Sequence, residues 1–153
     1  MSGFVASGTV VPVTLTNDGF WPDIEGEAVR AAMRLEPGIT PERLTEAVVA
    51  AMVNVNRELR SYKLARQAEG QTKLADVPAD EINGESELVI IYRRAIYCSA
   101  GAEVAERFPN TDTSRHGAMH AEQLAPTVDD LRRDARFAIR DLLAVSRTTV
   151  ELL

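Results

Sequence analysis

The strongest constraint on the fold is an apolar stripe that recurs every three or four residues between Thr40 and Glu69. This spacing places apolar side chains on one face of an α-helix, and it persists for about six turns. The stripe consists of Leu44, Ala47, Val48, Ala51, Met52, Val55, Leu59, Tyr62 and Ala65. At 1.5 Å per residue such a helix is about 45 Å long, whereas a compact chain of this length is roughly 38 Å across. We therefore expect an elongated molecule, or one partly covered by other copies.

Local signals mark where this helix and three others begin and end. Thr40 is a good cap, the proline after it suits the first helical position, and Gly70 ends the helix. Asp23 predicts the cap of an earlier helix that continues to about Leu35. A third helix is expected over about 85–108, where Gly101 lies between two alanines and lets another helix approach closely. Thr127 opens a last helix that continues to about residue 145.

The predicted fold class is all-α, with four helices in an antiparallel bundle over residues 23–145. Residues 1–22 are predicted to be an extended N-terminal arm and residues 146–153 a C-terminal tail. The β-prone residues lie near the termini, so we expect their backbone groups to pair only with another chain. At 153 residues the chain is predicted to be one domain.

The connector Gly70–Ser86, between the two longest predicted helices, is longer than the usual helix–helix connection of about 2–8 residues. It differs from a flexible linker because it contains the apolar residues Leu74, Val77 and Ile82, and because Pro78 restricts the backbone. A connector with its own apolar anchors suggests a surface that another molecule contacts.

Composition narrows the function further. The net charge of −6 disfavours a freely diffusing nucleic-acid binder, because such proteins carry a basic surface. No segment approaches the about 20 apolar residues that a membrane helix needs. The one cysteine, Cys98, lies on or near the apolar face of its helix, which favours an inert, buried thiol over a nucleophile. No phosphate-binding or nucleophile motif is present, so we expect no enzyme activity and no cofactor.

Two alternatives to a purely structural role remain. The first is metal-dependent hydrolysis through His116 and His120, which are four residues apart, but Gly117 stands where the metalloprotease motif has glutamate. Exposed histidines that bind no metal are therefore favoured. The second is a small cytoplasmic DNA-binding helical protein that uses the last helix. Four aspartates are interspersed among the four arginines of this helix, so a solvated, salt-bridged face is favoured over DNA binding. The arginines are Arg132, Arg133, Arg136 and Arg140.

Three stretches carry a resemblance to a known family. They are FWPDI at Phe20–Ile24, MRL at Met33–Leu35, and LADVPADEINGES at Leu74–Ser86. Together with the segment Tyr92–Ala95, the following Cys98 and TVDDL at Thr127–Leu131, they resemble the head completion (head stabilisation) proteins of P2-like contractile-tailed phages, the GPL family. The similarity extends from about residue 20 to 139, and it is weaker in the N-terminal arm, at Pro126 and after Val145.

The resemblance implies a structural head–tail connector without catalytic activity. Such a protein joins the portal vertex after DNA packaging, extends the DNA tunnel and offers a docking surface to neck or tail completion proteins. It implies a place in the virion after assembly in the cytoplasm of the bacterial host. It also implies a ring of about twelve copies on the portal, and it is compatible with a monomeric chain in isolation. Packaged DNA would pass through without sequence recognition.

We predict three contact surfaces toward the portal, the neck protein or a neighbouring subunit. The first is the arm at Phe20 and Trp21. The second is the connector, through Leu74, Val77, Pro78 and Ile82. The third is the C-terminal tail from Ser146, which we expect to dock on the portal through Val150, Leu152 and Leu153.

Overall fold

The computed structural model describes residues 13–108 and 126–144, and within these ranges the chain is mostly helical. The long helices are α2 (Pro41–Glu58), α4 (Glu87–Arg107) and α6 (Val128–Leu142). The shorter ones are α1 (Gly26–Ala32), α3 (Arg60–Ala68) and a 3₁₀ turn, η1 (Leu74–Asp76). Two antiparallel hairpins complete the fold: β1 (Thr14–Leu15) with β2 (Ile24–Glu25), and β3 (Glu81–Ile82) with β4 (Glu85–Ser86).

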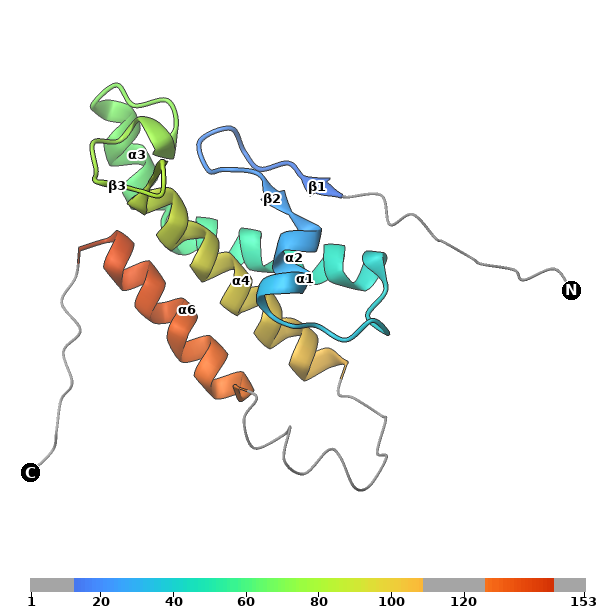
Figure 1. Cartoon of the computed structure of the whole chain (residues 1–153). Helices are drawn as coiled ribbons and strands as arrows, with labels where there is room; N and C mark the ends of the chain where they lie inside the picture. Colours follow the sequence, from blue (N-terminus) through green and yellow to red (C-terminus); the bar gives the residue numbers. More distant parts are fainter. Residues whose placement is uncertain (1–12, 109–125, 145–153) are drawn as a thin grey trace, which may run out of the picture.

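Helix α4 is the centre of the fold because it packs against both α2 and α6. Figure 1 shows α4 and α6 side by side and antiparallel, with α1 lying over the middle of the molecule. Gly101 of α4 confirms the predicted narrow waist. A Cβ atom there would lie 3.0 Å from the Met33 sulfur and 3.5 Å from a methyl group of Leu131 in α6, so a side chain at this position would force the Met33 side chain to move.

The prediction of a mostly helical fold is confirmed, but a regular four-helix bundle is not. The first helix is only seven residues long, and its N-cap position is Glu25 rather than Asp23, without a capping hydrogen bond to the Glu25 side chain. Asp23 has a different role, since its carboxylate accepts a hydrogen bond from the backbone N–H of Asn17 at 2.8 Å. Residues 24 and 25 form β2, so the helix begins later than predicted.

The single helix predicted over Thr40–Glu69 is also wrong, because it is interrupted at Leu59 (φ −89°, ψ 7°). Hydrogen bonds on either side continue, from the N–H of Leu59 to the Val55 carbonyl and from Lys63 to the Leu59 carbonyl. The chain therefore stays hydrogen-bonded across the break. The Leu59 side chain is fully buried, and α3 presents Tyr62 and Lys63 to the turn at residues 17–21.

The expectation that the β-prone N-terminal residues need another chain is wrong for β1. Thr14 pairs with Glu25 and Leu15 with Ile24, within the same chain. The N–H of Gly26 then donates to the Val13 carbonyl at 2.9 Å, which extends the hairpin into the start of α1. Residues 13–22, expected as part of an extended arm, thus fold onto the helices in the structure.

The start of the last helix agrees with its prediction. The Thr127 hydroxyl accepts a hydrogen bond from the Asp130 N–H, and the Asp130 carboxylate accepts one from the Thr127 N–H. This reciprocal pair is a capping box, which satisfies backbone donors that a helix start leaves free. None of the helices in the described ranges is long and apolar enough to span a membrane.

Candidate functional site

Two of the predicted contact segments, the arm at Phe20–Trp21 and the connector Gly70–Ser86, meet in the structure. The N–H of Leu74 donates to the Phe20 carbonyl at 2.9 Å, which joins η1 to the turn at residues 17–21, called the N-terminal turn below. A groove of about 380 Å³ lies where they meet, and Trp21, Lys73 and Ala75 are among its lining residues. The two segments are about 50 residues apart in the sequence, and no sequence pattern predicted that they would be in contact.

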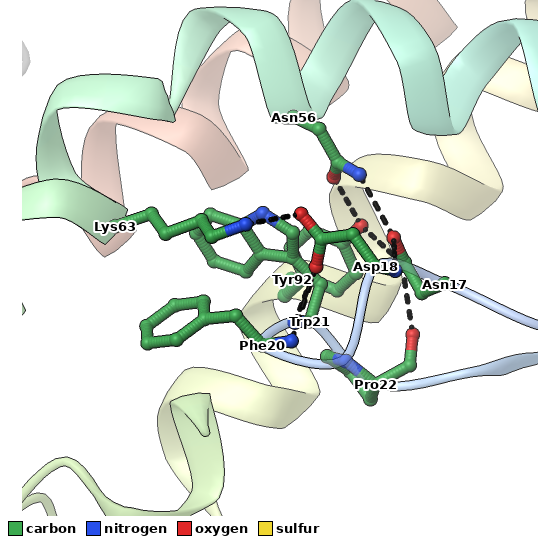
Figure 2. A network of polar contacts seen from close by, with 8 residues as sticks. All are labelled: Asn17, Asp18, Phe20, Trp21, Pro22, Asn56, Lys63 and Tyr92. Atoms are coloured by element: carbon green, nitrogen blue, oxygen red, sulfur yellow. Dashed lines mark hydrogen bonds and ion pairs between the residues drawn. The ribbon is translucent and has the colours of Figure 1, made fainter. Parts of the chain in front are cut away.

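The N-terminal turn is held by a polar network that the sequence analysis missed (Figure 2). The Asn17 amide donates to the Tyr92 hydroxyl at 2.8 Å and to the Pro22 carbonyl at 3.0 Å. Tyr92 donates to the Asn56 carbonyl oxygen at 2.6 Å, and the Asn56 amide donates back to the side-chain oxygen of Asn17 at 2.8 Å. Three side chains from the turn, α2 and α4 thus form a closed cycle.

Burial raises the pKa of Tyr92, although the hydrogen bonds from Asn17 and to Asn56 act in the opposite direction. The hydroxyl therefore keeps its proton at physiological pH and stays a donor in the cycle. Its function in the described structure is to hold the turn.

Asp18 is the second anchor of the turn. One carboxylate oxygen accepts from the backbone N–H groups of Phe20 and Trp21 at 3.1 and 3.2 Å, and the other pairs with the Lys63 ammonium at 2.6 Å. Partial burial by itself would raise the pKa of Asp18, but these hydrogen bonds and the charge of Lys63 outweigh it and lower the pKa. The carboxylate is thus ionised at neutral pH and ties the turn to α3.

Phe20 and Trp21 belong to the core of this chain, being only 3% and 2% exposed. The Trp21 ring stacks on Tyr92 at 4.8 Å with an interplanar angle of 6°, and Phe20 meets Trp21 edge-on at 4.8 Å. The indole N–H has no acceptor among the described residues, so stacking and burial hold the ring. These side chains therefore face their own core rather than a partner.

The connector divides into a buried and an exposed half. Leu74 and Val77 are 0% and 6% exposed and belong to the same core, whereas Pro78 is exposed and Ile82 is 56% exposed. The exposed half is the β3–β4 hairpin, in which Asn83 and Gly84 have φ of 53° and 75°. Positive φ at both central residues is typical of a type I′ turn, which Asn-Gly favours. This dipeptide could have predicted the hairpin from sequence.

The hairpin is fixed to the helices at its base. Arg93 of α4 pairs with Glu85 at 2.6 Å, and the N–H of Glu87 donates to the Asp80 carbonyl at 2.9 Å. Ile82 is thus an exposed apolar side chain on a short, defined hairpin, and of the predicted connector residues it is the best placed for a partner. The predicted tail contacts Val150, Leu152 and Leu153 lie outside the described residues.

The alternative DNA-binding surface is partly neutralised. Arg132 pairs with Glu106, and Arg133 pairs with Asp130 and Asp134 at 2.8 and 3.2 Å. Arg136 and Arg140 are exposed on the same helix. Two of the four arginines therefore already have acidic partners within the chain.

The metal and thiol alternatives gain no support from the described residues. His116 and His120 lie outside them, and within them no group of three or more His, Cys, Asp or Glu side chains is arranged to hold a metal ion. Burial raises the pKa of the Cys98 thiol, which reduces its reactivity.

Comparison with known proteins identifies relatives over nearly the whole chain. Over 136 residues it is 41% identical to the head completion/stabilization protein of Escherichia phage P2, covering 89% of this chain and 80% of the relative. It is 27% identical over 139 residues to the probable head completion/stabilization protein of Haemophilus phage HP1 (strain HP1c1), covering 91% of each. No solved structure matches it. Residues 15–153 match the model of the phage head completion protein (GPL) family, and the chain therefore belongs to that family.

Proposed function

We propose that this protein is a structural head–tail connector, which joins the portal vertex of a phage head after DNA packaging. The observation that carries the proposal is family membership over residues 15–153, together with relatives named as head completion proteins. In this role the protein is a virion component that is assembled in the host cytoplasm, and it needs neither a catalytic group nor a cofactor.

The connector acts as a ring of about twelve copies that extends the DNA tunnel and presents a docking surface to the neck or tail completion protein. Its acidic balance supports this role. Twelve copies at −6 carry about −72, and like charge keeps packaged DNA from binding to the tunnel wall. DNA then passes through the ring without sequence recognition. The ring is positioned on the DNA path because it assembles on the portal.

The tail from Ser146 is the proposed portal contact, through its terminal apolar residues. A chain that ends at Val145 keeps every described helix and hairpin, so it is expected to fold and to lose portal binding. Pull-down on purified portal, with circular dichroism as the folding control, measures both. Portal binding equal to that of the full chain would reject the tail as the contact.

Ile82 on the β3–β4 hairpin is the proposed contact toward the next ring or a neighbouring subunit. Replacing the buried Leu74 or Val77 would disturb the core, whereas Ile82→Ser changes an exposed side chain. We expect Ile82→Ser to fold normally and to reduce the yield of completed, tailed particles in a complementation assay by about tenfold, the loss of roughly 1.4 kcal/mol.

Leu64→Ser is the matched control, because Leu64 on α3 is also 56% exposed. Particle yield should stay near that of the unchanged protein with this variant. An equal loss with both variants would mean that the hairpin has no specific role.

A further inference from the structure

The outward face of α2 carries an ordered pattern that the core does not use. In a helix, steps of three and four residues lie along one face, and the face opposite the buried stripe contains two acids, then two valines, then two arginines. In chain order these are Glu42, Glu46, Val49, Val53, Arg57 and, at the start of α3, Arg60. We call this set the α2 ridge.

The valines of the α2 ridge are uncovered in the described structure. Val49 is 45% and Val53 is 49% exposed, although both are large apolar side chains in the middle of a long helix. Neighbouring exposed valines one turn apart form a small apolar patch, and patches bordered by charged residues are typical of contact sites.

The charges at the two ends of the α2 ridge have opposite sign and are largely available. Arg57 and Arg60 are exposed and have no ion-pair partner among the described residues. At the other end, Arg107 contacts both Glu46 (3.1 Å) and Glu103 (3.1 Å), so one cation is shared by two acids. Arg43 lies over the Phe108 ring, 4.8 Å from its centroid. The Glu42 end therefore stays acidic and the Arg60 end basic.

The order of charges along the α2 ridge is complementary to the same order on a second copy that runs in the opposite direction. If a second copy lies antiparallel about a two-fold axis near residue 51, Val49 faces Val53 of the other copy. Glu46 then lies beside Arg57, and Glu42 opposite Arg60. A parallel arrangement would instead place acid against acid, which costs free energy.

We infer that the α2 ridge is a docking surface for a second copy of this chain, arranged antiparallel about a two-fold axis. A two-fold contact uses the same patch on both partners and closes after two copies. It therefore needs no portal to close, and it differs from the ring contacts of the proposed function, on which it does not depend.

The contact is weak by its size. An 18-residue helix is about 27 Å long, so a strip about 10 Å wide covers roughly 270 Å² per copy, well below the about 800 Å² of a standard interface. Pairing is therefore expected only at high protein concentration, and it weakens with added salt because exposed charges contribute. Such a pair would separate into single subunits on dilution.

Sedimentation velocity of the full-length chain over a concentration series, at low and at high salt, tests the contact. Unchanged protein should show a concentration-dependent dimer that salt weakens. Arg57→Glu/Arg60→Glu makes the whole ridge acidic, so its dimer should weaken at least about tenfold. Glu42→Lys/Glu46→Lys makes the ridge basic and should weaken the dimer likewise.

The decisive sample is the equimolar mixture of these two variants, in which an all-acidic ridge meets an all-basic one. The mixture should form dimers at least as readily as the unchanged protein, although the dimer of each variant alone is weakened. Arg136→Glu/Arg140→Glu is the matched control, since it changes the charge equally on α6 and should leave dimerisation unchanged. Circular dichroism melting checks that every variant folds.

Three results would overturn the inference. They are an unchanged protein that stays monomeric at the highest concentration, a dimer that survives Arg57→Glu/Arg60→Glu, and a mixture of the two ridge variants that stays monomeric. The first would mean that the valines are covered by another part of the chain or by a different partner. The other two would place any dimer contact on a different face.

Discussion

At the scale of single residues, Asp18 does most to connect the N-terminal turn with the helices. Its carboxylate accepts two backbone N–H groups within the turn and pairs with Lys63 of α3. Tyr92 forms the other connection through Asn17 and Asn56. Both side chains position the stacked aromatic rings rather than perform chemistry.

Replacing Asp18 by Asn is expected to make the stability of the protein less dependent on pH. The folded-state pKa of Asp18 lies below its ordinary value of 3.8, so its stabilising effect is fully present above that value and is lost as pH falls through the folded-state pKa. At pH 7 we expect Asp18→Asn to lower the free energy of unfolding by about 1 kcal/mol. This is less than a buried charged hydrogen bond contributes, because the Asp18–Lys63 pair is partly exposed.

Urea unfolding at pH 7 and below pH 4 measures this difference, which should shrink at the lower pH. Asp80→Asn is the matched control, because the exposed Asp80 side chain has no partner among the described residues. An Asp18→Asn deficit that stays the same down to pH 3 would show that charge at this position is irrelevant.

At the scale of elements, local signals predicted the starts of α2 and α6, which are capped by Thr40 and Thr127, but they did not predict the start of α1 or the break before α3. Thr127 and Asp130 form their cap from neighbouring residues alone, so the sequence sufficed. The late start of α1 goes with the pairing of Ile24 and Glu25 in β2, and α3 after the break at Leu59 contacts the N-terminal turn about 40 residues earlier through Tyr62 and Lys63. No local pattern contains that information.

The β3–β4 hairpin provides a prediction at this scale. Gly84 has a φ of 75°, and a Cβ atom added there would have no neighbour within 4 Å, so a side chain meets strain only from the backbone. A left-handed conformation costs a non-glycine residue about 1–2 kcal/mol. Gly84→Ala should thus open the hairpin, seen as faster amide hydrogen exchange at Glu85 and Ser86, while the helices stay protected.

Gly38→Ala is the control, since Gly38 has equally open space but an ordinary φ. It should be neutral or slightly stabilising, because alanine restricts the unfolded chain. Unaltered exchange in Gly84→Ala would mean that contacts outside the turn hold the hairpin closed.

At the scale of the whole molecule, the candidate surfaces were only partly predictable. Phe20 and Trp21 read equally well as anchors for a partner or for their own core, because an aromatic pair beside a proline is compatible with both. The structure places them in the core, since Tyr92 supplies a stacking partner from a distant helix. Ile82 is exposed as a contact residue should be, but it was predicted together with three other connector residues, and two of these, Leu74 and Val77, are buried in the core.

The net charge of −6 leads to a prediction for the isolated protein. Because Arg132 and Arg133 already pair with acids of the same chain, we expect no measurable binding to a labelled DNA duplex in fluorescence anisotropy, even at about 50 mM salt. Binding that falls steeply with salt would favour the alternative of a DNA-binding helical protein. Arg136→Glu/Arg140→Glu would then identify the surface.

The bond between the Leu74 N–H and the Phe20 carbonyl has a consequence during protein synthesis. The N-terminal turn leaves the ribosome first, yet its cover, Leu74 and Tyr92, is among the later residues. At about 5–20 residues per second, the roughly 70 residues between Trp21 and Tyr92 take about 4–14 s to translate. During that interval Phe20 and Trp21 have no core to enter. The N-terminal turn therefore cannot complete its packing until Tyr92 has been made, and Phe20 and Trp21 expose apolar surface that favours aggregation until then.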